Sequence, residues 1–472
     1  MILTQLKKNK QIVYVFIFIF LIATFVFLRL YNIKNSIEFW GDIGRDHEKL
    51  MEWLQTGKPP LLGPNTSVLP ILNQSAWFYY LIFPVFLLTH SGLSMTYTVT
   101  ILTVFLFIIS MIIQLKKHRG IVMMVFLLIS IHPLIVIQQR TPWNPSFSIP
   151  FLLVAISGII RLSYSYSNKI LLIVLMALSF SLGMTYSLFP IVVILGMWSY
   201  LSVPKGKKKQ FILYAGLSFL LVFAPTLIFE LKPHYFIEHF SVSLLTGSSS
   251  FFERLIKVQS YLLLGQDVQN ISTILKSILI GCFYGSIFIA NKSNLVFKRI
   301  FIIAIIGTLL TALLPFDNSH YFFGVIVLWF FVFSLTNKPT KIILLSSFVL
   351  FWVNPFWVSQ YTKSSIRALS IVEECAKTVC TYNKNSYFVS SVTWYGSHSA
   401  HDHAFLLNKY GCFSRDIVSN PTFKSNQMIV VADRATFTPY KDSFYELEQF
   451  GKYRVKTNYY CSSGLQYWLL TK

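Results

Sequence analysis

The chain begins with Lys7, Lys8 and Lys10, followed closely by the run IVYVFIFIFLIATFVFLRL, Ile12–Leu30. A helix that crosses a membrane needs about 20 apolar residues, and this run is long enough. A cleaved signal peptide has a shorter apolar region and a cleavage site of small residues, and neither is found here. We therefore expect a retained membrane helix whose basic end lies in the cytoplasm.

The composition predicts many such helices. Of 472 residues, 54% are hydrophobic and only 12% are charged, whereas a soluble chain carries about a quarter charged residues. This excludes a soluble enzyme, a disordered protein and a fibrous repeat. Ten further apolar runs bring the predicted spans to eleven: Tyr97–Leu115, Ile121–Ile137, Phe147–Leu162, Ile170–Tyr186, Phe189–Leu201, Phe211–Phe229, Ser277–Ala290, Ile300–Leu314, Tyr321–Leu335 and Ile342–Trp357.

The distribution of charge supports this count. Trp77–Leu88 is shorter, begins with four aromatic residues and is typical of a helix in the membrane interface. If it does not span, alternating loops on one side hold seventeen Lys and Arg and no Asp or Glu. Cytoplasmic loops collect Lys and Arg, so the net charge of +22 indicates orientation and not a nucleic-acid surface. All acids before residue 358 then lie outside, which indicates that the protein works there.

The C-terminal part has a different composition. From about Ser359 charges of both signs return, with helical patterns over 364–379 and 403–410 and strand-like runs such as 387–392 and 427–431. We predict a polytopic α-helical membrane domain over 1–358, with interfacial helices in its first outer loop, 31–96. A small extracytoplasmic α/β domain follows over 359–472. The predicted location is the cytoplasmic (inner or plasma) membrane, with the N-terminus in the cytoplasm.

The C-terminal cysteines and histidines each allow two interpretations. Cys375, Cys380, Cys412 and Cys461 predict two disulfides if the compartment is oxidising, with three possible pairings. The pair Cys375–Cys380 is the least expected, and four reduced thiols are the alternative. His398, His401 and His403 have a spacing that suits a metal, or they mark the solvated start of a helix capped by Ser399.

The first outer loop carries the densest polar stretch of the membrane domain, Glu38–Glu48. We expect it to open a short helix that ends at Gly57, before Pro59 and Pro60. Asp42 and Asp46 are four residues apart, so they share one face if the segment is helical. Charged groups at a membrane surface are costly unless they are used or paired. A purely structural interpretation is also open, in which Asp42 is an N-cap and Arg45 balances nearby acids.

Several motifs together resemble the GT-C superfamily of membrane glycosyltransferases. The similar branch contains the dolichyl-phosphate-mannose protein mannosyltransferases and the bacterial aminoarabinose transferase that acts on lipid A. The segments that carry the resemblance are Gly41-Asp42-Ile43-Gly44-Arg45-Asp46, Leu61-Leu62-Gly63-Pro64, the aromatic Trp77–Tyr80, Arg140 with Trp143-Asn144-Pro145, Phe229-Glu230-Leu231-Lys232 and His320-Tyr321-Phe322.

The resemblance implies an inverting glycosyltransferase that moves a hexosyl or pentosyl group from a polyprenyl-phosphate donor to an acceptor hydroxyl outside the membrane. The acceptor would be a lipid, a glycan or a protein. It implies Asp42 as the catalytic base, with Asp46 beside it. Asn144 stands where some relatives have an acid, and Thr185-Tyr186 where they have His-Tyr. The expected substrate-binding residues are Arg45, Arg140, Asn144, Lys232, His320 and Tyr321.

Residue chemistry is consistent with this reaction. One carboxylate near the acceptor takes its proton, and fixed cations stabilise the charge of the leaving phosphate. No metal ligand is assigned, and a divalent cation is compatible with the mechanism without being required. The alternatives are a transporter or flippase for a lipid-linked or anionic substrate, and a surface-polysaccharide polymerase or ligase. Transporters usually carry ionisable residues within their spans, which these runs lack except at their edges.

Overall fold

In a computed structural model of the chain, the structure describes residues 2–65, 73–115, 118–231, 250–265, 273–291, 294–314, 319–353, 355–365, 367–382, 385–393, 396–417, 423–433, 437–441 and 444–472. They form two compact units. The helical unit comprises Met1–Tyr31, Leu61–Leu81 and Thr96–Val358. The sheet unit comprises Asn32–Pro60, Ile82–Met95 and Ser359–Lys472, so most of the segment expected to be the first outer loop packs with the C-terminal residues.

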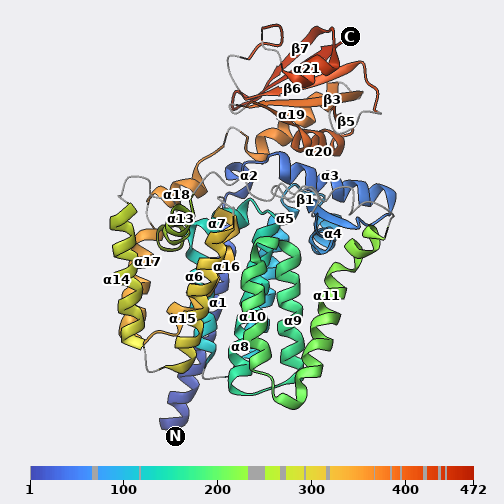
Figure 1. The fold of residues 1–472 in the computed structure, drawn as a ribbon. Coiled ribbons are helices and arrows are strands. Elements are labelled where there is room, and N and C mark those ends of the chain that lie inside the picture. The colour runs from blue at the N-terminus through green and yellow to red at the C-terminus, as the bar shows by residue number, and fades with distance from the viewer. Residues whose placement is uncertain are drawn as a thin grey trace. The chain divides into compact units, whose positions relative to one another are not determined.

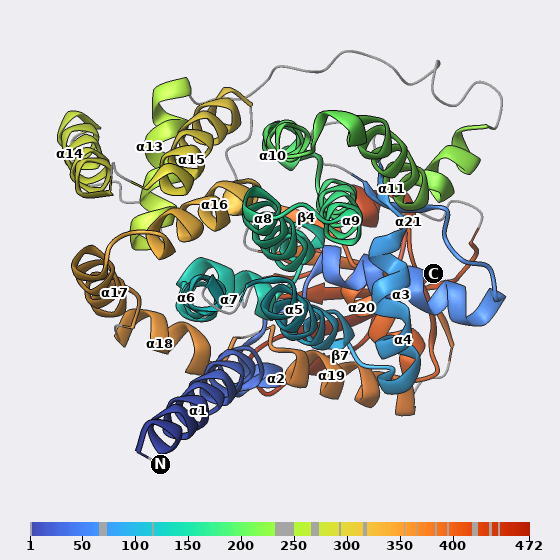
Figure 2. The same cartoon turned by 90° about the horizontal axis from the view of Figure 1, so that it is seen from below.

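The helical unit is a bundle of apolar helices (Figures 1 and 2). Its elements are α1 (Ile2–Leu30), β1 (Leu62–Asn65), β2 (Asn73–Ser75), α6 (Arg119–Ile131), α7 (Pro133–Arg140), η2 (Asn144–Phe147), α8 (Ser148–Tyr164), α9 (Asn168–Met184), η3 (Tyr186–Leu188), α10 (Phe189–Leu201), η4 (Lys205–Lys207), α11 (Lys208–Glu230), α13 (Phe251–Leu264), α14 (Thr273–Asn291), α15 (Leu295–Leu313), η5 (Ser319–Phe322), α16 (Phe323–Ser334) and α17 (Lys338–Trp352). Three more helices have residues in both units: α4 (Trp77–Thr89), α5 (Ser94–Ile113) and α18 (Pro355–Thr362). Helix α8 is buried along almost its whole length and packs against α9, α10 and α16.

The apolar helices make this an integral membrane fold. Among the described residues, five helices are long and apolar enough to cross a membrane, or six if a bent pair is one span. The expected count of eleven stays a prediction, because several of the remaining apolar helices have fewer than 18 residues. Trp77–Leu88, expected in the interface, lies in the 13-residue helix α4.

The bent pair corrects one expected span. We expected a single helix over Ile121–Ile137, but α6 ends at Ile131 and α7 continues at an angle of 67°. Pro133 has no N–H to donate to the carbonyl of Ile129. The fully buried Arg29 at the end of α1 replaces it, because its Nη2 donates to Ile129 O at 2.8 Å and its Nη1 to Ser130 O at 2.5 Å.

The sheet unit is a mixed α/β layer structure. It contains α2 (Ile33–Ser36), α3 (Gly41–Thr56), α19 (Leu369–Tyr382), β3 (Ser386–Thr393), β4 (Gly396–Ser399), α20 (His401–Lys409), β5 (Phe413–Asp416), β6 (Gln427–Ala432), α21 (Tyr445–Phe450), β7 (Arg454–Tyr460) and β8 (Gln466–Thr471). The strand order is β4-β3-β6-β8-β7, with β5 also paired to β3. Strands β5 and β6 run parallel to β3, and the other pairs are antiparallel.

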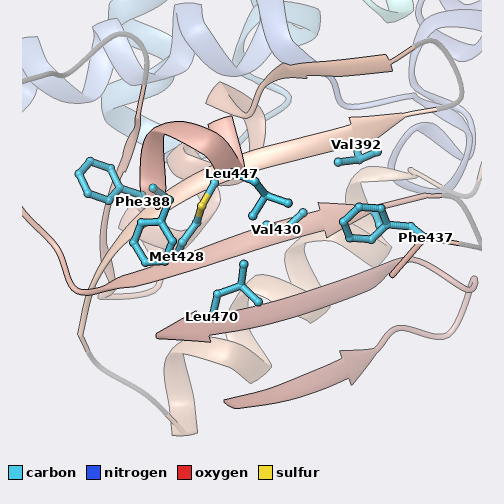
Figure 3. Packing of buried hydrophobic residues seen from close by; sticks show 9 residues of the cluster. Phe388, Val392, Met428, Val430, Phe437, Leu447 and Leu470 are labelled. Carbon is cyan, nitrogen blue, oxygen red and sulfur yellow. The ribbon is translucent and has the colours of Figure 1, made fainter. Parts of the chain in front are cut away.

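Alternation along the strands builds the core of this unit. Phe388, Val430 and Leu470 lie on one face of the sheet and pack with Leu447 and Phe450 of α21 (Figure 3). Side chains two apart on a strand share a face, so alternate residues of β3 and of β6 enter this core together. The expected strands at 387–392 and 427–431 are therefore confirmed as β3 and β6.

Two disulfides join α19 to the rest of the sheet unit. They link Cys375 to Cys461 and Cys380 to Cys412. The prediction of two disulfides is confirmed, and the least expected pairing is not formed. Ser399, expected to cap α20, ends a strand instead, and Ala400 precedes the helix without a side-chain cap.

Candidate functional site

Helix α3 presents the polar motif of the first loop in its first two turns. Trp40 precedes the helix in an extended conformation, and Gly57 ends it with φ of 68°, where a side chain would be strained. The helix is thus formed as expected up to Gly57. Asp42 is not its N-cap, which corrects the structural alternative, but lies in the first turn, where the helix dipole favours negative charge.

One guanidinium joins the two aspartates of the motif. Arg45 Nη1 lies 2.8 Å from Asp42 Oδ1, and Arg45 Nη2 lies 3.0 Å from Asp46 Oδ1. The Asp42 side chain is 49% exposed and that of Asp46 only 4%. Asp42 Oδ2 has no hydrogen-bond partner among the described residues. The arrangement therefore holds Asp46 in place and leaves one oxygen of Asp42 accessible from solvent.

Two neighbours on α3 are functional candidates that sequence reasoning did not single out. His47 is buried, its Nδ1–H donates to Ile43 O at 2.7 Å, and its Nε2 accepts from Ser94 Oγ at 2.9 Å. Burial lowers the pKa of His47 to about 4, so the ring is neutral. Glu48 Oε2 lies 2.6 Å from His401 Nδ1. Burial alone would lower the pKa of His401, but the hydrogen bond and charge of Glu48 outweigh it and raise that pKa.

The expected binding residues Arg140 and Asn144 belong to the helical unit. Arg140 is buried, and its Nη1 and Nη2 donate to Leu28 O at 2.9 Å and to Tyr31 O at 3.0 Å. These carbonyls lie at the C-terminal end of α1, where backbone acceptors lack helical partners. Asn144 begins η2 and donates from Nδ2 to Met184 O at 2.7 Å. Both side chains thus hold backbone at the C-terminal ends of helices, α1 and α9 respectively.

Two motif segments that were far apart in sequence meet in the helical unit. The ring centroids of Trp143 and His320 are 5.1 Å apart, and those of His320 and Tyr321 are 4.1 Å apart. His320 is buried and Tyr321 partly exposed. The structure therefore brings η2 and η5 together, which sequence spacing did not show.

Two hydrogen bonds hold strand β2 of the β1–β2 hairpin against the helices. Tyr186 donates from its hydroxyl to Asn73 O at 2.8 Å, and Ser75 Oγ donates to Val222 O at 2.6 Å. In the Thr185-Tyr186 pair, the tyrosine therefore has a structural partner, the backbone of β2. Lys232 lies outside the described residues, as does the side chain of His398.

The expected site residues thus form two groups, one in each unit. Asp42, Arg45 and Asp46 are together on α3 in the sheet unit. Arg140, Asn144, His320 and Tyr321 belong to the helical unit. In the part of the chain that the structure describes, no three His, Cys, Asp or Glu side chains are grouped as metal ligands.

The bundle of apolar helices and the small α/β sheet together have the fold of an aminoarabinose transferase of known structure. Two solved structures share this fold: ArnT from Cupriavidus metallidurans bound to undecaprenyl phosphate, and the same protein in the apo state. Each has a TM-score of 0.61 and 10% sequence identity, over 97% and 98% of this chain respectively and 98% of the ArnT chain. No protein-family model and no curated protein matches the sequence. The likeness confirms the resemblance at the level of the fold.

Proposed function

We propose that the protein is an inverting glycosyltransferase that uses a polyprenyl-phosphate sugar and an acceptor hydroxyl outside the membrane. The observation that carries the proposal is the group on α3, in which Arg45 bridges an exposed Asp42 and a buried Asp46. The ArnT fold over nearly the whole chain supports it, because one ArnT structure contains undecaprenyl phosphate. The proposal includes a cytoplasmic N-terminus and an outer location for residues 359–472.

The chemistry needs one base and several hydrogen-bond donors. Asp42 takes the proton of the acceptor hydroxyl while that oxygen bonds to the anomeric carbon of the sugar. The bond between that carbon and the phosphate oxygen breaks, and the electron pair leaves with the phosphate. Arg45 holds the two aspartates in place. Lys232 is proposed to stabilise the phosphate charge.

The remaining motif residues are proposed to shape the donor site. Asn144, His320 and Tyr321 lie on short 3-10 turns that face one another through Trp143. Arg140 donates to the carbonyls at the end of α1. We therefore propose that it supports the donor site by holding α1 and does not contact the donor itself. An apolar tail would then lie among the surrounding helices.

The test uses the full chain in lipid nanodiscs and a panel of labelled undecaprenyl-phosphate sugars, with bacterial membranes as the source of acceptor. We expect one donor to be consumed, and Asp42→Asn to reduce its turnover by about 100-fold or more. The matched control is Glu52→Gln, because Glu52 is on the same helix, 55% exposed and paired to Lys49 at 2.8 Å. Wild-type turnover in Asp42→Asn would overturn the assignment of the base. Failure to consume any donor would overturn the transferase.

A transporter or flippase is the second candidate, because of the broken span. Transport proteins use broken helices and buried charges, and α6–α7 with Arg29 shows both. The described residues contain one such broken pair, which is weaker support than the paired breaks usual in transporters. Movement of undecaprenyl phosphate across proteoliposomes without release of any sugar would favour this candidate.

A further inference from the structure

Helices α3 and α20 lie side by side (Figure 1), and their backbones meet at Gly44. A Cβ at this position would lie 2.6 Å from the carbonyl carbon of His401 and closer still to the Cα and N atoms of Asp402. Only glycine allows this approach, because the opposing atoms are main chain and have no rotamer to change. The second glycine of the motif therefore serves a contact with the C-terminal residues, between the two positions that carry Asp42 and Asp46.

Two side chains of α3 extend this contact by one helical turn. The ring of His47 packs 5.0 Å from the ring of Phe405 on α20. Glu48 and His401 form their hydrogen bond at 2.6 Å, with side chains only 16% and 18% exposed. A hydrogen bond shielded from water is stronger and better oriented than one on the surface. The pair therefore fixes the rotation of α3 about its own axis.

The start of α20 is in turn fixed to the sheet. Arg367 Nη2 donates to Asp402 Oδ2 at 2.6 Å and to His403 Nε2 at 3.2 Å. Since an arginine can only donate, His403 Nε2 accepts, and its Nδ1–H donates to the Tyr467 hydroxyl at 2.7 Å. Tyr467 belongs to β8, in the interior of the sheet order. Helix α20 is thus a rigid support and not a loosely attached element.

We propose that Glu48 and His401 are positioning residues for the reaction, through which the C-terminal domain holds α3 and with it the carboxylate of Asp42. The inference rests on the proposed function for its effect on turnover. Asp42 and Glu48 are six residues apart on one helix, so a rotation of α3 moves both. A displacement of about 1 Å at a reacting group costs up to roughly 100-fold in rate.

The kinetic test compares Glu48→Ala, His401→Ala and the double variant on the donor that the wild type consumes. We expect each single change to lower kcat about 10-fold with the KM for the donor unchanged, because Asp42 acts on the acceptor. The double variant should be no worse than either single one, since both remove the same hydrogen bond. Glu48→Gln should keep kcat within about twofold, because an amide still bonds to His401.

Glu52→Ala is the control for the loss of a carboxylate on α3 and should leave turnover unchanged, because its partner Lys49 is on the same helix and exposed. Unchanged kcat in Glu48→Ala would overturn the inference. Losses that multiply in the double variant would overturn it as well, because they would mean that the two residues act separately.

A second measurement keeps the inference testable if no donor is consumed. Hydrogen exchange of the α3 amides should be about 10-fold faster in Glu48→Ala and His401→Ala than in the wild type, while β6 and β8 keep their protection. Slow exchange of α3 in both variants would overturn the positioning role even for an active enzyme. If the wild type consumes no donor but the α3 amides exchange faster in both variants, only the proposed function is overturned, and the role of Glu48 and His401 in holding α3 stands.

Discussion

Gly44→Ala adds one methyl group where α3 crosses α20. The new carbon would lie 2.6 Å from the carbonyl carbon of His401, whereas ordinary contacts of a Cβ begin at 3.4 Å. The two helices would therefore have to separate locally by about 0.8 Å or more. The nearest atoms belong to the backbone of Asp402, so no side-chain rotation relieves the overlap.

The expected magnitude combines two opposing effects. Alanine is the better helix former by about 1 kcal/mol, while overpacking against a fixed neighbour costs about 1–3 kcal/mol and occasionally more. Because the neighbour is main chain, and the separation also stretches the bond between Glu48 and His401, the upper end applies. We expect a net loss of about 2 kcal/mol, which corresponds to a Tm lower by roughly 4–8 °C for a unit of this size.

The assay measures the thermal unfolding of the detergent-solubilised full chain by calorimetry. The matched control is Gly216→Ala, which changes a glycine inside α11 whose Cβ would meet no atom within 4 Å. That variant should unfold at the wild-type temperature or slightly above it, because only the helix-propensity effect operates. If Gly44→Ala is as stable as Gly216→Ala, the close packing of α3 on α20 is refuted.

Three further perturbations have defined outcomes. Replacing Cys375 and Cys461 by alanine should lower the free energy of unfolding by about 4.6 kcal/mol, and replacing Cys380 and Cys412 by about 3.7 kcal/mol. The bridged cysteines are 86 and 32 residues apart, and the longer loop restricts the unfolded chain more. Calorimetry of the two double variants measures the difference. Burial lowers the pKa of His47 and of His403 to about 4, so the folded state favours the neutral rings. The stability that each contributes above pH 6.5 should be lost as the pH falls from 6.5 to 4, by up to roughly 3 kcal/mol for each histidine. A plot of Tm against pH measures this loss. Arg140→Lys should destabilise the chain by about 2 kcal/mol, since an ammonium cannot replace the forked hydrogen bonds to the end of α1, and an unchanged Tm would contradict this.

Local signals predicted several elements well. Gly57 marked the end of α3, and the alternation of large apolar residues marked β3 and β6. The break at Pro133 was missed although the signal was present, because the apolar run continued through it. The β1–β2 hairpin was also missed: β2 is only three residues long and is held by hydrogen bonds to η3 and α11.

The candidate site was predicted in part. The spacing of Asp42 and Asp46 placed them on one helical face, and the structure confirms this with Arg45 between them. Spacing did not reveal His47 or Glu48 as functional candidates, because their partners Ser94 and His401 are 47 and 353 residues away in the chain.

The sequence by itself determined what depends on composition and on local period: an integral membrane protein, a polar helix in the first loop and a small α/β unit at the end. A run of apolar residues indicates that a face is buried, and polar residues at positions i and i+4 of a helix indicate that two groups are neighbours. Neither states which distant residue covers that face. The tertiary structure alone decided that Gly44 lies on Asp402, that Glu48 bonds to His401 and that Arg140 supports the end of α1. These contacts join segments that share no local pattern, so packing and hydrogen-bond satisfaction in the folded chain select them.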